Sequence, residues 1–258
     1  MTAVLPDWYI SDQPSAKLNR TGPDGNRSLI SIVVSTLNEE DNLRPVLHWS
    51  ALYADELIVV DGHSTDATRE IAYECGAKVV LDNNLGKGDA IRVGIMKATG
   101  DILVFIDADG SHDPRDIPAL VKPIVDGISD HVSGSRMLGG SDELHSTAHQ
   151  FVRLLGNQII TLGINYILGV RLTDSENGFR AILRPVALTL NLQENIHTIE
   201  QEMIIKTIRS GYRIMETATH EYKRTNGHSK LLISKTWFQF VRSWLYYLFI
   251  WRPSNNTL

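Results

Sequence analysis

The sequence predicts an α/β protein with a mostly parallel, doubly wound sheet and helices on both faces. Short apolar runs rich in β-branched residues alternate with helical segments, and the connections between them are short. Polar residues gather directly after these runs, where open α/β sheets place their ligands. A chain of 258 residues, of which 43% are hydrophobic and 21% charged, is long enough for one large domain of this kind.

The first half of the chain contains four predicted strands separated by three helices. Acidic residues begin the first helix at the positive end of its dipole, Thr65 or Asp66 caps the second, and Gly100 ends the third. The strands are wholly apolar rather than alternating, which indicates burial on both faces. The predicted strands are residues 29–36, 56–60, 77–81 and 102–106, and the helices reach to about Tyr53, Cys75 and Ala98.

The second half of the chain supplies a further strand and three helices. A strand is predicted at 130–136, a helix at about 146–168 and another from Ile199 that ends before Gly211. Residues 237–251 carry aromatic and aliphatic side chains at helical spacing, in a run too short to span a bilayer. We expect this amphipathic C-terminal helix to pack on the domain or form a homodimer, with membrane-surface contact as the alternative.

Composition and charge exclude several classes of protein. The net charge of −5 gives no basic surface for nucleic acid. Cys75 is the only cysteine, which excludes internal disulfides and cysteine-based zinc sites and favours a cytoplasmic protein, peripheral at the membrane if the last helix lies there. We predict an N-terminal arm, expected to be partly disordered, a catalytic domain, and a C-terminal helix and tail. Their bounds are 1–28, 29–235 and 236–258.

Two carboxylates follow the strand at 102–106. Asp107 and Asp109 lie on one face if the backbone stays extended, and oxygen ligands so placed suit Mg²⁺ or Mn²⁺, which proteins hold by one or two carboxylates plus substrate phosphates. The alternative is the start of a helix, which explains Asp113 before Pro114 but not the two earlier residues.

Two other loops at strand ends are also candidates for ligand contact. Asp61 is either a turn former or an acceptor for a base or ribose. Gly86-Lys87-Gly88 is either a plain loop or a source of a lysine and free backbone N–H groups for a phosphate. It lacks the spacing of a P-loop, and the chain has no G-x-G-x-x-G motif, which disfavours two common nucleotide folds.

Seven segments in order resemble the family 2 glycosyltransferases with the GT-A fold, in particular the dolichyl- and polyprenyl-phosphate mannosyl- and glucosyltransferases. The resemblance covers about residues 29–235. The segments are Ser35-Thr36-Leu37-Asn38-Glu39-Glu40, Val60-Asp61-Gly62-His63-Ser64-Thr65-Asp66, Gly86-Lys87-Gly88, Asp107-Ala108-Asp109, Gly134-Ser135-Arg136, Asp174-Ser175-Glu176-Asn177-Gly178-Phe179-Arg180 and Arg224-Thr225-Asn226-Gly227-His228-Ser229-Lys230.

The resemblance implies a role for each segment. Glu39 and Asp61 would contact the nucleoside, Lys87 would lie near the donor, and the 224–230 loop would close over the diphosphate. Asp107 and Asp109 would hold the metal. The implied nucleotide-sugar contacts are Ser35, Leu37, Glu39, Asp61, Lys87, Asp107, Ala108, Arg136, Arg180, Arg224, Ser229 and Lys230. The implied catalytic residues are Asp109, Asp174, Glu202 and Arg224.

Three groups of side chains in the second half have two interpretations each. Arg136 binds a phosphate bidentately or forms a surface salt bridge. His145, His149 and Arg153 share one face of a predicted helix, where the histidines are metal ligands or face the acceptor. The acidic pair Glu200 and Glu202 either stabilises a helix start or places Glu202 near the sugar.

The leading hypothesis is a metal-dependent, inverting transferase that uses a GDP-hexose such as GDP-mannose and a lipid-phosphate acceptor. The alternative is a GT-A-fold mutase that interconverts the pyranose and furanose forms of a GDP-sugar without an external acceptor. A third class, a nucleotide-sugar sensor, is disfavoured by the presence of Asp107, Asp109 and Arg224 together.

Overall fold

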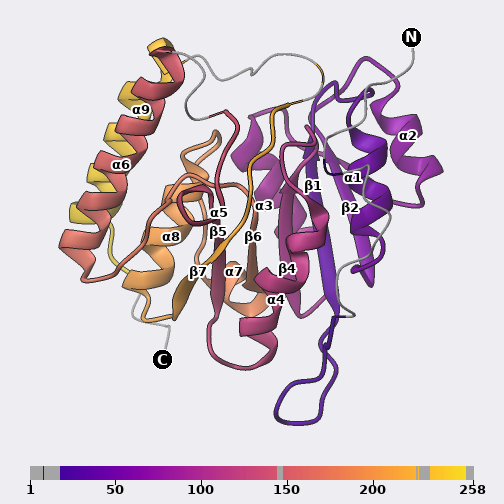
Figure 1. Cartoon of the computed structure of the whole chain (residues 1–258), viewed down its shortest axis with the longest axis horizontal. Coiled ribbons are helices and arrows are strands. Elements are labelled where there is room, and N and C mark those ends of the chain that lie inside the picture. The colour runs from indigo at the N-terminus through magenta and orange to yellow at the C-terminus, as the bar shows by residue number, and fades with distance from the viewer. Residues whose placement is uncertain (1–7, 9–17, 144–147, 225, 227–232, 254–258) are drawn as a thin grey trace.

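The predicted α/β class and mostly parallel sheet are confirmed. The computed structural model describes Trp8 and residues 18–143, 148–224, 226 and 233–253. These residues form a seven-stranded sheet in the order β3-β2-β1-β4-β6-β5-β7, with helices packed on it (Figure 1). The strands are β1 (Ile30–Thr36), β2 (Glu56–Asp61), β3 (Lys78–Leu81), β4 (Ile102–Asp107), β5 (His131–Ser135), β6 (Arg180–Leu183) and β7 (Ile214–Ala218).

The helices of the first half follow the predicted order, and the second half adds short helices that were not expected. The helices are α1 (Leu43–Ser50), α2 (Thr68–Glu74), α3 (Lys87–Lys97), α4 (Ile117–Val125), α5 (Arg136–Gly139), α6 (Ala148–Leu168), α7 (Arg184–Thr189), α8 (Ile199–Arg209) and α9 (Ile233–Leu245). A 3₁₀ turn, Pro114–Asp116, precedes α4, and α9 continues as a π-helical turn, Tyr246–Ile250.

Strand β6, like the short helices α5 and α7, was not predicted from the sequence. It runs antiparallel to both β4 and β5, with Arg180 opposite Phe105 and Ser133. Arg180 ends a polar segment of the sequence, and only three apolar residues follow it. Four residues are too few to give a recognisable period, so the pairing depends on the neighbouring strands.

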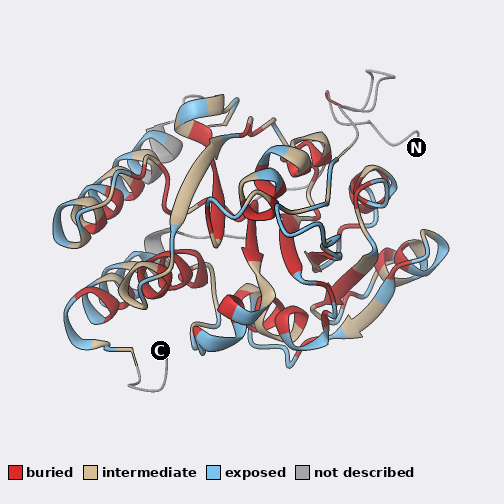
Figure 2. Ribbon diagram, turned by 90° about the horizontal axis from the view of Figure 1, so that it is seen from below, coloured by how far each residue is buried: buried red, intermediate tan, exposed pale blue. Residues whose placement is uncertain are grey.

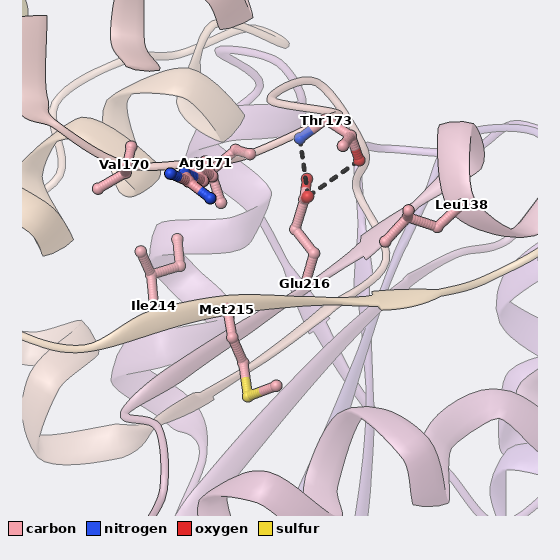
Figure 3. A pocket seen from close by; sticks show the side chains of 8 residues that line it. Leu138, Val170, Arg171, Thr173, Ile214, Met215 and Glu216 are labelled. Carbon is pink, nitrogen blue, oxygen red and sulfur yellow. Dashed lines mark hydrogen bonds between the residues drawn. The ribbon is translucent and has the colours of Figure 1, made fainter. Parts of the chain in front are cut away.

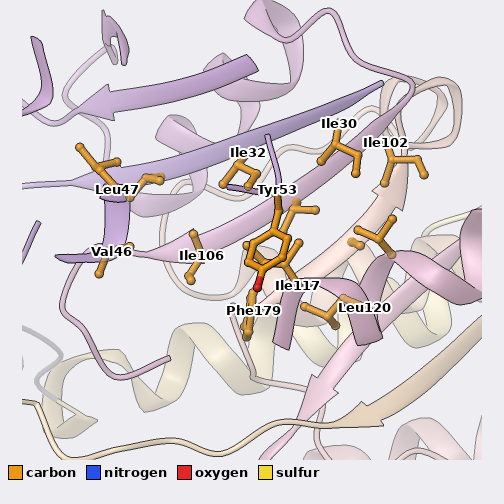
Figure 4. Close-up of a cluster of buried hydrophobic side chains, with 14 of the residues drawn as sticks. Ile30, Ile32, Val46, Leu47, Tyr53, Ile102, Ile106, Ile117, Leu120 and Phe179 are labelled. Carbon is orange, nitrogen blue, oxygen red and sulfur yellow. The ribbon is translucent and has the colours of Figure 1, made fainter. Parts of the chain in front are cut away.

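The apolar strands bury side chains on both faces, as the continuous hydrophobic runs predicted. Along β4, Ile102, Val104 and Ile106 point into one cluster, and Leu103 and Phe105 point into the other. Figure 4 shows the first cluster, in which β1 and β4 pack against α1 and α4. Trp8 of the N-terminal arm joins this cluster, and its indole N–H donates to the Gly110 carbonyl at 2.8 Å.

A third cluster attaches α6 and α9 to α8 at one end of the sheet (Figure 1). The expectation that the C-terminal helix packs on the domain is confirmed for one of its faces. Trp244 lies so close to Gly163 of α6 that a Cβ there would come within 2.1 Å of its ring. Among the described residues, no helix is both long and apolar enough to cross a membrane.

Candidate active site

The register of the sheet brings the carboxyl ends of β1, β2 and β4 to one edge. Ser35 pairs with Val60 on one side and with Asp107 on the other, and Thr36 pairs with Asp61. These strands are parallel, so the polar residues that follow them meet at the same place. The predicted cluster of strand-end residues is therefore present in the fold.

Asp107 ends β4 and forms an ion pair with Lys87, the first residue of α3. The Lys87 ammonium lies 2.8 Å from Asp107 Oδ1 and 2.9 Å from Glu200 Oε1. Burial alone would raise the pKa of Asp107, but the charge and hydrogen bond of Lys87, together with the nearby His112 and His197, outweigh it and lower that pKa to about 2. Asp107 is therefore a carboxylate at neutral pH, as a metal ligand must be.

Asp109 is held by Ser111 and by Arg224. Its Oδ1 accepts from the Ser111 hydroxyl at 2.7 Å and from its backbone N–H at 3.0 Å, and its Oδ2 accepts from the Arg224 guanidinium at 2.7 Å. Arg224 also lies 3.5 Å from Glu39 Oε1. Segments more than a hundred residues apart in the sequence thus contribute one charged cluster.

The donor set fits Mg²⁺ or Mn²⁺. Both candidate ligands are hard carboxylate oxygens, and no group of three or more His, Cys, Asp or Glu side chains that could hold a metal occurs among the described residues. A cation bound here would need further oxygen ligands, which is how Mg²⁺ is held between one or two carboxylates and substrate phosphates. Lys87 and Arg224 already place positive charge beside the same carboxylates.

Gly178 lies directly against this ion pair. A Cβ on Gly178 would come within 2.7 Å of the Lys87 ammonium nitrogen and within 2.9 Å of Asp107 Oδ2, so a larger residue would displace the ends of these two side chains. The Asn177-Gly178-Phe179 segment therefore passes close to the ion pair. This residue belongs to a predicted segment, but its contribution was not foreseen.

The residues expected around the nucleoside lie at the ends of β1 and β2. The side chain of Leu37 is 42% exposed, whereas Asp61 is fully buried. Asp61 accepts from the Ser64 backbone N–H at 2.9 Å and from the hydroxyls of Ser64 and Thr36 at 2.5 and 3.3 Å. Asp61 thus holds the turn after β2 in place, and its contact with a nucleoside remains a prediction.

Arg136 forms a buried ion pair instead of the predicted open phosphate contact. Its guanidinium donates to Asp174 at 2.6 and 2.9 Å and to Glu221 at 3.2 Å, and its side chain is only 5% exposed. Arg180 is also buried, and it donates to the backbone carbonyls of Asn177 and Glu200. These side chains fix the 174–180 segment beside the cluster and do not reach into it in this arrangement.

Glu202 does not join the cluster, which corrects our expectation of an acidic residue near the sugar. It accepts from the backbone N–H groups of Gln193 and Glu194, both at 2.8 Å, and pairs with Lys206 at 2.7 Å. Glu200 reaches Lys87 instead. Side chains two positions apart on a helix, such as Glu200 and Glu202, point about 200° apart. Only one of them could face the site, and the sequence alone did not show which.

Several predicted residues cannot be placed. His145, Ser229 and Lys230 lie outside the described residues, as does most of the 224–230 loop beyond Arg224 and Asn226. His149 and Arg153 fall within α6, whose backbone is described there. Their predicted roles stay predictions.

An open groove of about 490 Å³ lies between β7 and residues 170–173 (Figure 3). On its floor, Glu216 accepts from the Thr173 N–H at 2.7 Å and hydroxyl at 2.9 Å, and from the Asp174 N–H at 2.8 Å. The groove therefore adjoins the ion pair of Arg136 with Asp174, on the side of the molecule away from β3.

Glu200→Gln should mainly reduce turnover, whereas Glu202→Gln should mainly reduce stability. Glu200→Gln removes one of the two carboxylates that orient Lys87, so we expect turnover to fall about 10- to 100-fold, as for other orienting partners of a charged site, although Asp107 still pairs with Lys87. Glu202→Gln breaks a buried pair with Lys206 and should lower the free energy of unfolding by about 3–5 kcal/mol. Urea denaturation and steady-state kinetics on both variants test this, and equal kinetic losses would contradict it.

Comparison with known proteins finds glycosyltransferases among the relatives of this chain. The family model for Glycosyl transferase family 2 matches residues 31–188. The chain is 30% identical to glycosyltransferase AglJ of Haloferax volcanii over 77% of its own length and 64% of that protein. It is 28% identical to a dolichyl-phosphate hexose transferase of the same organism, over 78% of the chain and 86% of that protein.

A solved structure gives the same picture of the fold. Glucosyl-3-phosphoglycerate synthase from Mycobacterium tuberculosis, in complex with Mn²⁺ and uridine-diphosphate-glucose, superposes with a TM-score of 0.70. The match covers 88% of this chain and 81% of that one at 24% identity. The family model covers the β1–β4 core that carries Asp107 and Asp109 and extends to the 174–180 segment that approaches them. The chain belongs to glycosyl transferase family 2.

Proposed function

We propose that the protein transfers a hexosyl group, with inversion, from a nucleoside diphosphate sugar to a lipid phosphate, and that the donor is a GDP-hexose such as GDP-mannose. The observation that carries this is the pairing of Asp107 with Lys87 and of Asp109 with Arg224 at the end of β4. Two carboxylates for a cation and two side-chain cations for a diphosphate are what cleavage of a sugar–phosphate bond requires.

The chemistry follows from the charge that develops on the leaving group. As the bond between the sugar and the diphosphate breaks, negative charge grows on the departing nucleoside diphosphate. Bound Mg²⁺ or Mn²⁺, held by Asp107 and Asp109, would offset part of this charge. Lys87 and Arg224 would orient the diphosphate and supply further positive charge, which counts for more in a buried site than in water.

The acceptor side needs no side-chain base. A phosphate monoester is already anionic, so its oxygen can attack the anomeric carbon from the face opposite the leaving group. Attack from that face inverts the configuration, and the sugar passes through an oxocarbenium-like state. The named dolichyl-phosphate hexose transferase, which matches over 86% of its length, supports a lipid phosphate as acceptor for this chain.

Assays with and without acceptor test the proposal. Purified protein with Mn²⁺ should convert GDP-mannose and a short-chain polyprenyl phosphate to a glycosylated lipid phosphate, and it should do so less efficiently with UDP-glucose. If the protein used UDP-glucose but not GDP-mannose as donor, the proposed reaction would stand and the proposed nucleobase would be wrong. A rearranged GDP-sugar formed without acceptor would identify the mutase instead, and no turnover with any pair would contradict both.

A further inference from the structure

Between residues 151 and 167, the outward side chains that the structure describes on α6 are apolar. Its inner face is already used, since Asn157 donates to Asp174 at 3.0 Å and Thr161 bonds to Ser175 at 2.8 Å. The outward side chains recur at helical spacing and are exposed by 47–90% of their surface. They are Val152, Leu155, Ile159, Leu162 and Tyr166. A solvent-facing helix surface normally carries charged residues here.

The neighbouring helix repeats this pattern. α9 and its π-helical turn bury Tyr247 and Leu248 against α8, while other apolar side chains point outward. These are Phe238, Leu245, Phe249 and Ile250, each exposed by 43–67%. The two helices lie side by side in Figure 1, and exposed positions follow both of them in Figure 2. We call these nine residues the α6–α9 face.

The charge of the two helices is one-sided. The chain contains 30 acidic residues, yet none occurs in α6, in α9 or in the π-helical turn. The charged residues there are basic, and Arg242 and the following Arg252 are exposed. An apolar face on helices that carry basic residues and no acidic residue is the composition of a helix that lies in the interface of an anionic bilayer.

We propose that the α6–α9 face docks on an anionic lipid bilayer, with both helices lying in the plane of the interface. A symmetric dimer through this face would bring two copies of the same helices together. Their basic residues would then find no acidic partners on the helices opposite. A bilayer supplies both the apolar layer and the anionic headgroups. This proposal rests on the proposed transfer to a lipid phosphate, because docking on the bilayer would bring the active site to a membrane-bound acceptor.

Vesicle binding tests the docking surface. The wild-type protein should co-sediment with phosphatidylglycerol-containing vesicles and bind more weakly to pure phosphatidylcholine or at high salt. Ile159→Glu with Phe238→Glu places a carboxylate on each helix, and partitioning should fall at least about tenfold. Tyr73→Glu with Met96→Glu is the matched control, because these residues are also highly exposed but lie on α2 and α3 at the other end of the sheet.

The outcomes separate the docking surface from the reaction. Circular dichroism and melting must show that all three proteins are folded. A wild type that stays in the supernatant with both vesicle compositions, or a stable dimer by light scattering that Ile159→Glu with Phe238→Glu dissociates, would overturn the proposal. Transfer to a water-soluble short-chain acceptor measures the proposed reaction independently. If that transfer fails while vesicle binding responds to the variants as expected, the docking surface stands and the proposed function does not.

Discussion

Asp107→Asn should reduce turnover by at least about 10²–10³-fold, the cost of removing one preorganised electrostatic partner of a transition state. The substitution keeps the shape of the side chain but removes the charge that faces Lys87 and would bind the cation. Metal-dependent affinity for a nucleoside diphosphate should fall as well. Steady-state kinetics and calorimetry with and without Mn²⁺ measure both effects, and Asp109→Asn should behave in the same way.

A matched control for this experiment is Asp126→Asn. Asp126 also pairs with a lysine, Lys122, but does so on the exposed surface of α4, far from the end of β4. Its loss should leave turnover and nucleotide affinity unchanged, since exposed pairs contribute little. If both Asp107→Asn and Asp109→Asn retained wild-type nucleotide affinity in Mn²⁺, the assignment of these residues as metal ligands would be wrong.

Arg136→Met should lower the free energy of unfolding by about 3–5 kcal/mol, because it leaves two buried carboxylates, Asp174 and Glu221, without their cation. Urea denaturation at neutral pH measures the change. Arg213→Met is the control, since Arg213 pairs with Asp130 but its side chain is 56% exposed, and its loss should cost far less stability than the loss of Arg136. Similar losses for the two variants would show that burial of the Arg136 pair has no special weight.

The effect of Arg136→Met should depend on pH. Burial would raise the pKa of Asp174, but the pair with Arg136 outweighs it and holds that pKa well below its usual range. A carboxyl whose pKa is lowered by folding stabilises the protein above its unfolded pKa of about 4, and this contribution is lost as the pH falls. Without Arg136, burial alone acts on Asp174, so this carboxyl of the variant takes up a proton at a higher pH than in the wild type. The stability difference between wild type and Arg136→Met should therefore shrink as the pH falls from neutral, and a constant difference would contradict this account.

The strand-end residues could be predicted because local patterns determine them. Continuous apolar runs indicate strands buried on both faces, and parallel strands must bring their carboxyl ends to one edge. Asp107 and Asp109 are found there beside Lys87, as the sequence indicated. The part of the site carried by β1, β2 and β4 was thus open to prediction.

Side chains that contact the cluster from distant elements could not be chosen in advance. Glu200 and Glu202 differ only in which side of α8 they occupy, and that depends on how the helix docks against α3 and α9. The sequence left Arg136 open as a phosphate ligand. Its true partners, Asp174 and Glu221, are 38 and 85 residues away, so the buried ion pair could not be recognised from the local sequence. Local sequence does not report such contacts.

The sequence by itself determined the class of fold, the presence of the first four strands along the chain and the carboxylates that follow β4, because apolar periodicity and the chemistry of strand ends are local properties. Only the tertiary structure decided that Glu200 orients Lys87, that Gly178 lies against the ion pair of Lys87 with Asp107, and that one face of α9 is buried while the other joins α6 as an exposed apolar surface. Each of these depends on how elements far apart in the chain pack together. The burial of a residue there is decided by the side chains that contact it and not by its own type.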